Sequence, residues 1–584
     1  MVSADIKELA TEWLRIDRDE DTRDEIYKLL VQGNEDELRK RLTPRIAFGT
    51  AGLRARMEAG FARMNAVTVI QASQGLAEYV MEKCEDVKQR GVIVGRDARH
   101  NSEKFARLTA AAFVAKGIKV WWLEVPVHTP LVPFGVKQLN AAAGIMITAS
   151  HNPPQDNGYK VYWENGCQII PPHDKGIAAS ILKHLDPISW DESVVDDSML
   201  VQGTLGLVQD EYAKAVAYAA DWEGKLKTTS DLKLKFAYTA MHGVGLTYMT
   251  RALEQLGVAQ YMHVVQEQAH PDPDFPSVKF PNPEEKGAMD MSYLSADRAG
   301  IELILANDPD ADRFAVAQNV DGKWHQFTGN QLGVLLASHV LQAYTKSKEK
   351  LAMLSSTVSS RMLAVMAEKE GFHHEETLTG FKWMGNMALH LDEKGYDSRF
   401  SFEEAIGYMI PGVVHDKDGV AAAATFLTAV VQWQEQGLTP WTKLQELYST
   451  YGHFEDANTY LISPSPSVTE EVFKYVRSLG SPYPETLGKR KVHKWRDLTL
   501  GCDSSTDDHT PKLPVDAESQ MITCEVDGDV RFTVRGSGTE PKIKFYIEGQ
   551  GKSSEGAKKE ANAVLKELLE EWFIPEKYGL TLAA

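Results

Sequence analysis

Three segments of this 584-residue chain repeat one local pattern, an apolar strand, a polar or glycine-rich turn, an amphipathic helix and a closing glycine. They run from Val92 to Gly117, from Leu234 to Gly257 and from Leu351 to Gly371. Glycine directly after the last helical residue is the expected helix stop. Because strand, helix and strand in succession favour parallel pairing with right-handed crossovers, the pattern predicts three similar α/β units.

The last part of the chain has a different pattern. From about residue 456 we predict strands over 521–526 and 529–534, followed by a helix that turns Val564, Leu568 and Trp572 inward. The expected fold class is therefore α/β: three similar α/β domains with mixed, largely parallel sheets, plus a smaller C-terminal α+β domain. The expected domain bounds are 1–220, 221–328, 329–455 and 456–584.

Charge and composition limit the possible partners. The formal net charge is -19 without a long basic run, which argues against nucleic acid but leaves small anionic substrates open, since local charge decides their binding. The four cysteines have no close metal-ligand spacing, and the N-terminus has no apolar secretory segment. The longest apolar stretch, residues 420–433, falls short of the ~18 residues of a membrane span. We expect a cytoplasmic protein without membrane or nucleic-acid partners.

Ser150 stands at the end of a predicted buried strand. The mostly apolar run 141–149 leads directly into Ser150, His151 and Asn152, and two prolines stiffen the turn that follows. Ligands of open α/β sheets bind at the carboxyl ends of the strands. We therefore expect the Ser150 hydroxyl to be displayed on a rigid loop and not buried, although an ordinary loop serine would give the same local sequence.

Three carboxylates follow the predicted strand 301–306 at alternate positions: Asp308, Asp310 and Asp312, with Arg313 beside them. Hard oxygen ligands grouped on a tight loop suit Mg²⁺. A calcium EF-hand does not fit, because it needs glycine at the sixth and glutamate at the twelfth position, where this chain has Arg313 and Asn319. The alternative is a solvated acidic turn, which would not explain the crowding of like charges at a strand end.

Two further loops carry polar groups suited to a phosphosugar. Residues 535–542 combine an arginine, glycines, hydroxyls and a lysine, which suits a phosphate, although a glycine-rich hairpin would look the same. Glu403 and Glu404 could accept hydrogen bonds from sugar hydroxyls, with Thr379 and Gly380 upstream and Lys417 downstream. Taken locally, these residues could equally form a solvated face.

Together and in this order, the four motifs resemble those of the α-D-phosphohexomutase superfamily. The matching segments are Thr148–Pro154, Asp308–Arg313, the loop with Glu403 and Glu404, and Arg535–Pro541. With 49–54, 157–160 and 379–385, the resemblance spans nearly the whole chain and is strongest to the phosphoglucomutase-2 branch, whose members include phosphopentomutase and glucose 1,6-bisphosphate synthase.

The resemblance implies four domains around a central cleft and one Mg²⁺ per chain, held by Asp308, Asp310, Asp312 and the phosphate of a phosphorylated Ser150. It also implies that Lys160 and Lys417 lie around the reacting phosphate and hydroxyl. Because the attacking hydroxyl must lose a proton, we expect Lys160 or Lys417 to act with Ser150 as the base if a crowded cationic site lowers its pKa. The resemblance further implies a set of substrate-binding residues: Arg54, His151, Arg313, Thr379, Gly380, Glu403, Glu404, Ala405, Arg535, Ser537, Gly538 and Thr539.

The implied reaction is an intramolecular phosphoryl transfer on a sugar phosphate, through a sugar bisphosphate that also serves as activator, by a protein we expect to be a monomer. Many hexose-specific relatives carry serine where this chain has Ala405, so the identity of the sugar stays open between ribose, deoxyribose and glucose.

Three other functions compete with this reading. Bisphosphate synthesis is an alternative within the family. A phosphatase would pass the phosphoryl group to water, but Asp312 stands where haloacid-dehalogenase chemistry needs threonine or valine, and the histidines of a zinc phosphatase are missing. A phosphosugar-binding protein without turnover would not need a nucleophile and a metal site together.

Overall fold

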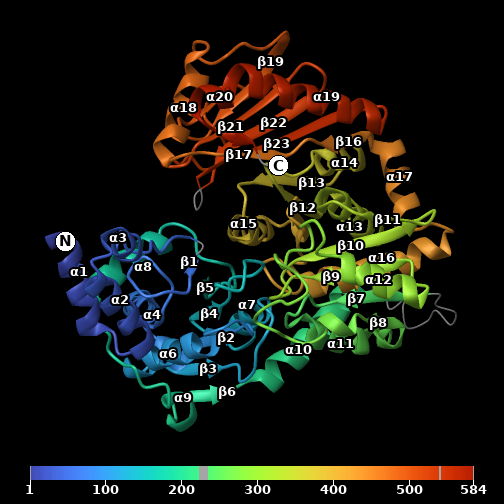
Figure 1. The fold of residues 1–584 in the computed structure, drawn as a ribbon. Helices are drawn as coiled ribbons and strands as arrows, with labels where there is room; N and C mark the ends of the chain where they lie inside the picture. Colours follow the sequence, from blue (N-terminus) through green and yellow to red (C-terminus); the bar gives the residue numbers. More distant parts are fainter. Residues whose placement is uncertain (1, 51, 222–233, 538–540, 583–584) are drawn as a thin grey trace. The chain divides into compact units, whose positions relative to one another are not determined.

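The computed structural model describes residues 2–50, 52–221, 234–537 and 541–582 (Figure 1). The chain forms two compact units. The first contains residues 1–345 and 381–438, and the second contains residues 346–380 and 439–584.

A six-stranded mixed sheet forms the first half of the first unit. Its strands are β1 (Leu53–Arg56), β2 (Val92–Arg96), β3 (Val120–Trp122), β4 (Ala143–Ile147), β5 (Asp156–Trp163) and β6 (Val201–Gly203), in the order β1-β5-β4-β2-β3-β6. Strand β2 pairs parallel with β3 and β4, and β3 pairs parallel with β6, whereas β5 is antiparallel to β1 and β4. Every residue of β2 and β4 is buried, as expected for central strands covered on both faces.

Helices cover this sheet, and three further helices precede it at the N-terminus (Figure 1). The covering helices are α4 (Ala66–Lys83), α6 (Ser102–Ala115), α7 (Leu131–Gln138) and α8 (His173–Lys183), with the short α5 (Val87–Arg90) and α9 (Val194–Asp197). Helix α10 (Leu205–Ala220) packs on α7, α11 (Gly245–Leu256) and α16 (Gly419–Glu435). Helices α6 and α7 contact β2 and β4, and α4 packs on α6 and α8. The N-terminal helices α1 (Ala4–Ile16), α2 (Glu20–Gln32) and α3 (Glu35–Leu42) pack on one another around Trp13, Ile26 and Leu38.

A second mixed sheet lies in the same unit. It contains β7 (Phe236–Thr239), β8 (Met262–Val264), β9 (Leu303–Asn307), β10 (Phe314–Val320) and β11 (Lys323–Gln326), in the order β11-β10-β9-β7-β8. Strand β7 is parallel to β8 and β9, and β10 is antiparallel to both of its neighbours. The helices are α11 (Gly245–Leu256), α12 (Asp290–Ala299) and α13 (Gly329–Ala343).

The last part of the first unit contains α15 (Phe381–Glu393), the antiparallel strands β14 (Asp397–Glu403) and β15 (Gly407–Met409), and α16 (Gly419–Glu435). Helix α16 contains the longest apolar stretch of the chain and is buried from Gly419 to Trp433 against α10, α11 and α13. Among the described residues, none of the helices has the length and apolar character needed to cross a membrane.

The second unit is built on an antiparallel sheet. The order is β18-β19-β21-β22-β23-β17-β24, with β16 on β23 and β20 on β19. The strands are β16 (His453–Asp456), β17 (Thr459–Ile462), β18 (Thr486–Leu487), β19 (Arg490–Asp497), β20 (Cys502–Asp503), β21 (Met521–Val526), β22 (Val530–Gly536), β23 (Lys542–Gly551) and β24 (Thr581–Leu582). The parallel pair β12 (Leu351–Ser356) and β13 (His373–Thr377) belongs to the same unit.

Helices complete this second unit: α14 (Met362–Glu370), α17 (Pro440–Tyr451), α18 (Pro466–Ser478), α19 (Ser554–Glu567), a π-helical turn (Leu568–Phe573) and α20 (Pro575–Tyr578). Val564, Leu568 and Trp572 are buried against the sheet, as predicted. The three strand–helix units and the C-terminal α+β region confirm the expected fold class, and glycine follows α11 and α14 in the left-handed conformation. The four domain bounds stay a prediction.

Candidate active site

Ser150 lies three residues after β4, in a loop with unusual backbone geometry. Its φ of 54° is left-handed, a region that residues with a side chain rarely adopt. The Thr148 hydroxyl accepts a hydrogen bond from the Ser150 N–H at 2.9 Å, and the Arg99 guanidinium donates to the carbonyl oxygens of Ser150, Asn152 and Pro153. These contacts fix the direction of the serine side chain.

The structure corrects the expectation that Ser150 is displayed, because only 2% of the residue is exposed. Its hydroxyl donates to Asp308 Oδ2 at 3.0 Å and lies 3.3 Å from His151 Nδ1. The expectation failed because the loop after β9, which comes from the other sheet of the same unit, covers the serine. A buried hydroxyl facing a carboxylate is shielded from competing water.

The predicted acidic residues converge at the carboxyl end of β9. Asp308, Asp310 and Asp312 are each fully buried, and one oxygen from each lies within 4.8 Å of the others. Ala311 has a left-handed φ of 50°, which turns the loop back on itself. Burial, followed by the charges of Asp310 and Asp312, holds the pKa of Asp308 well above its usual range. Three carboxylates buried this close together destabilise the folded state unless a cation neutralises part of their charge.

These residues fit a divalent cation. Within the described part of the chain, Asp310 Oδ1 and Asp312 Oδ1 are buried without a hydrogen-bond donor, although their Oδ2 atoms are bonded. Asp308 Oδ1 accepts from the Arg313 N–H at 3.0 Å. Buried carboxylate oxygens without donors are expected where a metal completes their coordination, and oxygen ligands select Mg²⁺ or a similar hard ion.

Lys160 and Lys417 reach the acidic cluster from distant parts of the chain. Lys160 lies on β5 and donates to Asp310 Oδ2 and Asp312 Oδ2, both at 3.0 Å, and Lys417 donates to Asp312 Oδ2. Burial disfavours the charge of Lys160, but Asp310 and Asp312 outweigh this effect and raise its pKa. The sequence-based condition for a base, a lysine with a lowered pKa in a cationic site, is therefore not met by Lys160 in this structure.

Backbone pairing joins the loop of Glu403, Glu404 and Ala405 to the acidic loop. Arg313 forms a β-bridge with Gly407, and the Phe314 N–H donates to the Ile406 oxygen at 3.1 Å. Ile406 has a φ of 51°, which is strained for a β-branched residue. The three predicted substrate residues of this loop are half-buried. Strained backbone positions cluster at functional sites, and the strained residue here, Ile406, comes directly after the loop of Glu403, Glu404 and Ala405.

Arg54 and His151 also lie beside the serine loop. Arg54 is on β1 and its guanidinium is 3.5 Å from Asn152 Oδ1, a marginal hydrogen bond. Burial, followed by the charges of Arg313 and Arg54, lowers the pKa of His151 well below its usual value. His151 is therefore a neutral imidazole at physiological pH, able to accept or donate a hydrogen bond next to Ser150.

The remaining predicted residues belong to the second unit. Thr379 and Gly380 form a half-buried turn directly before α15, with a positive φ of 105° at Gly380. Arg535 is near the end of β22, where its guanidinium lies 5.9 Å from the centre of the Tyr546 ring, and the Ser537 N–H donates to the Lys542 oxygen at 2.8 Å. Gly538 and Thr539 lie outside the described residues.

Sequence reasoning missed Arg99 and Thr129. Arg99 follows β2, the parallel neighbour of β4, so its place at the same sheet edge was a usable signal. Thr129 donates from its hydroxyl to Asp310 Oδ2 at 2.6 Å and from its N–H to the Asp310 oxygen at 2.9 Å. No local pattern distinguishes Thr129, because its partner is 181 residues away.

Family models of phosphoglucomutase/phosphomannomutase match most of the chain. The alpha/beta/alpha domain I model covers residues 45–186, the domain II model covers 210–322 and the domain III model covers 328–451. The chain belongs to this family, and it is an enzyme of the mutase class.

The chain is similar to several named enzymes and to a protein of known structure. The chain is 47% identical to a probable phosphoribomutase of Schizosaccharomyces pombe, covering 98% of this chain and 99% of that protein. It is 42% identical to the phosphopentomutase of Homo sapiens (97% and 96%) and 40% identical to the human glucose 1,6-bisphosphate synthase (97% and 94%). The fold is similar to that of the Paramecium phosphoglucomutase parafusin, with a TM-score of 0.69, 19% identity and coverage of 92% and 96%.

Proposed function

We propose that this chain is a phosphopentomutase that interconverts the 1- and 5-phosphates of ribose and deoxyribose, and more slowly the 1- and 6-phosphates of glucose. One observation carries the proposal: the buried Ser150 hydroxyl, 3.0 Å from Asp308, beside two buried carboxylate oxygens without donors. A pentose preference is supported by relatives at 42–47% identity that are named for pentose phosphates. It is also supported by Ala405, which offers no side-chain hydroxyl to a hexose.

In the proposed reaction, the Ser150 oxygen carries the phosphoryl group between sugar positions. The phosphoryl group passes from Ser150 to the free sugar hydroxyl, whose proton leaves to a base. The resulting sugar bisphosphate turns over and returns its other phosphoryl group to Ser150, so the sugar leaves isomerised. The restrained serine loop supplies positioning, which is the larger part of catalysis in phosphoryl transfer.

We assign the surrounding side chains to charge and proton control. Asp308, Asp310 and Asp312 would hold Mg²⁺, which neutralises charge on phosphoryl oxygens when bound. Arg313, Arg54 and His151 would contact the reacting phosphate. Lys417 is our preferred base, because Lys160 is held between two carboxylates. The glutamates of the 403–405 loop would bind sugar hydroxyls.

The non-transferred phosphate would be bound by residues of the second unit, as the family resemblance implies. These are Arg535, Ser537, Gly538 and Thr539. Thr379 and Gly380 would contact the sugar. We also propose that the protein is a cytoplasmic monomer.

Ser150→Ala tests the role of the serine. We expect mutase turnover on ribose 1-phosphate to fall at least about 10³-fold, while calorimetry still detects binding of the sugar phosphate. The control is Ser189→Ala, a serine outside the site. Unchanged turnover in Ser150→Ala would refute the assignment, and predominant release of free phosphate by the wild type would favour a phosphatase.

Glucose 1,6-bisphosphate synthesis is the second candidate, because relatives with that name are 40% identical over nearly the whole chain. The discriminating measurement supplies 1,3-bisphosphoglycerate with glucose 1-phosphate and quantifies glucose 1,6-bisphosphate. A bisphosphate yield faster than the isomerisation of ribose 1-phosphate would reverse the order of the two candidates.

A further inference from the structure

A cavity of about 270 Å³ opens in the first unit, and its lining residues do not include those of the acidic cluster. It lies between α4, α8 and the segment that leads into β1. Most of the side chains around it are apolar: Ile46, Phe48, Leu53, Ala72, Ile181 and Leu182. Its volume exceeds that of a few water molecules, and its walls offer water few hydrogen bonds.

Arg45 is the charged side chain among the lining residues of this cavity. Its guanidinium donates to Gln71 Oε1 at 2.6 Å and lies 4.4 Å from the centre of the Phe61 ring. Over the described part of the chain, no carboxylate lies within 4 Å of it. Against the effect of burial, Glu12 is the charge that acts to raise the pKa of Arg45, and its carboxylate is already paired with Arg15 at 2.7 Å.

The environment of Arg45 disfavours an unpaired charge. Burial lowers the pKa of the guanidinium, which means that the cation is poorly solvated there. A guanidinium has five donors in a rigid fork, and the Gln71 contact uses one nitrogen. The remaining donors match the geometry of a carboxylate, which would supply the missing negative charge.

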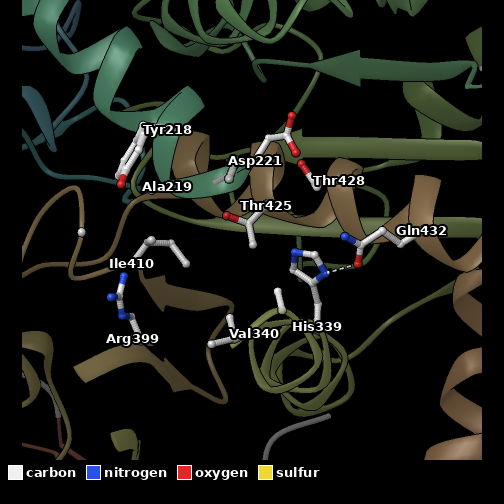
Figure 2. A pocket seen from close by; sticks show the side chains of 13 residues that line it. Tyr218, Ala219, Asp221, His339, Val340, Arg399, Ile410, Thr425, Thr428 and Gln432 are labelled. Carbon is white, nitrogen blue, oxygen red and sulfur yellow. Dashed lines mark hydrogen bonds between the residues drawn. The ribbon is translucent and has the colours of Figure 1, made fainter. Parts of the chain in front are cut away.

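A second cavity in the same unit shows the contrasting case. It measures about 70 Å³ and lies between α10, α13 and α16 (Figure 2). Its histidine and its arginine both have partners: His339 Nδ1 lies 3.1 Å from Gln432 Oε1, and Arg399 forms an ion pair with Asp397 at 2.6 Å. The arginine of the smaller cavity is therefore already neutralised by a carboxylate, whereas Arg45 in the larger cavity is not.

We propose that the cavity at Arg45 binds a medium-chain aliphatic carboxylate, with its carboxylate on the guanidinium and its chain along Ile46, Phe48 and Ile181. The apolar walls favour an alkyl chain over inorganic phosphate or a sugar phosphate. The single cation favours an acid over the corresponding alcohol. This site is separate from the proposed mutase site and does not depend on the proposed reaction.

Isothermal titration of the full-length protein with octanoate tests the proposal. We expect octanoate to bind with 1:1 stoichiometry, and 1-octanol to bind at least tenfold more weakly because it leaves the cation unpaired. Arg45→Gln should weaken octanoate binding at least tenfold, Arg45→Lys should weaken it less, and Arg23→Gln, an exposed arginine on α2, should leave it unchanged.

A second variant keeps the test valid if Arg45→Gln does not fold. Ala178 lines the cavity from α8, and Ala178→Leu should fill it and abolish octanoate binding while mutase turnover is retained. The proposal is overturned if the wild type does not bind octanoate, if octanol binds equally well, or if octanoate binds Ala178→Leu with unchanged affinity.

Discussion

Thr129 controls the orientation of one proposed metal ligand. Its hydroxyl donates to Asp310 Oδ2 at 2.6 Å, and the Lys160 ammonium donates to the same oxygen at 3.0 Å. Among the described residues, Asp310 Oδ1 has no donor and is available to a metal. Groups that orient a ligand in this way tune metal affinity without touching the metal.

Thr129→Val keeps the shape of the side chain and removes the donor. We expect Mg²⁺ affinity to fall by about tenfold, with most of the maximal turnover recovered at saturating Mg²⁺. A magnesium titration of activity and direct calorimetry measure the two effects. Thr109→Val, another buried threonine of the same unit, is the control. An unaltered magnesium requirement in Thr129→Val would contradict this role.

At the scale of secondary structure elements, the start of α16 packs closely on the acidic loop that carries Asp308, Asp310 and Asp312. Asp418 caps the helix by accepting from the N–H groups of Val420 and Ala421, and the Tyr212 hydroxyl donates to the same carboxylate at 2.8 Å. The Gly419 N–H donates to the Ala311 oxygen at 3.2 Å. A Cβ on Gly419 would lie 2.1 Å from the Arg313 oxygen, so the helix can approach this closely only with glycine.

Gly419→Ala should therefore push α16 and the adjacent Lys417 away from Asp312. Since displacement by about 1 Å can cost on the order of 10²-fold in rate, we expect kcat to fall at least tenfold. Gly206→Ala is the matched control, because a Cβ there meets open space and φ is not positive. Steady-state kinetics of both variants measure the effect. A kcat equal to that of the wild type in Gly419→Ala would show that turnover does not require the close packing of α16 on the acidic loop.

At the scale of the whole molecule, one carboxylate joins segments of the second unit that are far apart in sequence. Glu376 on β13 pairs with Arg496 on β19 at 2.8 Å and with Arg531 on β22 at 2.7 Å. Burial opposes its charge, but Arg531 and Arg496 outweigh burial and lower the pKa of Glu376 far below its usual value. Residues 346–380 are thereby attached to the C-terminal sheet.

Glu376→Gln should destabilise this unit by about 2 kcal/mol at pH 7, because two partly buried arginines lose their carboxylate. The pKa of Glu376 is lower in the folded state than the value of ~4.3 expected when unfolded, so its stabilising effect is complete above that pH. This stabilisation is lost as the pH falls further. The difference in the free energy of unfolding between wild type and Glu376→Gln should therefore narrow below about pH 4.

Urea denaturation at pH 7 and at pH 3.5 measures this difference in the free energy of unfolding. Glu375→Gln is the control, since its side chain lies next along the same strand and pairs with His373 instead. A gap of equal size at both pH values would show that the lowered pKa does not contribute to stability.

The sequence by itself determined the elements and the chemistry of the loops. Strands such as Met521–Val526 and helices that end at Gly257 and Gly371 follow from the period of apolar residues and from local stop signals. Asp308, Asp310 and Asp312 could be grouped from sequence because they share one tight loop, and the family resemblance was carried by motifs that are contiguous in the chain.

Only the tertiary structure decided which loops meet. It buried Ser150 under the loop of Asp308, brought Lys160 and Lys417 to Asp312, and placed Thr129 on Asp310. Neighbouring residues encode local conformation, whereas contacts across more than a hundred residues depend on how packed sheets and helices close on one another. Burial is a property of that closure, and so are the contacts with Asp310 and Asp312 that raise the pKa of Lys160 against the effect of burial. No local pattern could have revealed either one.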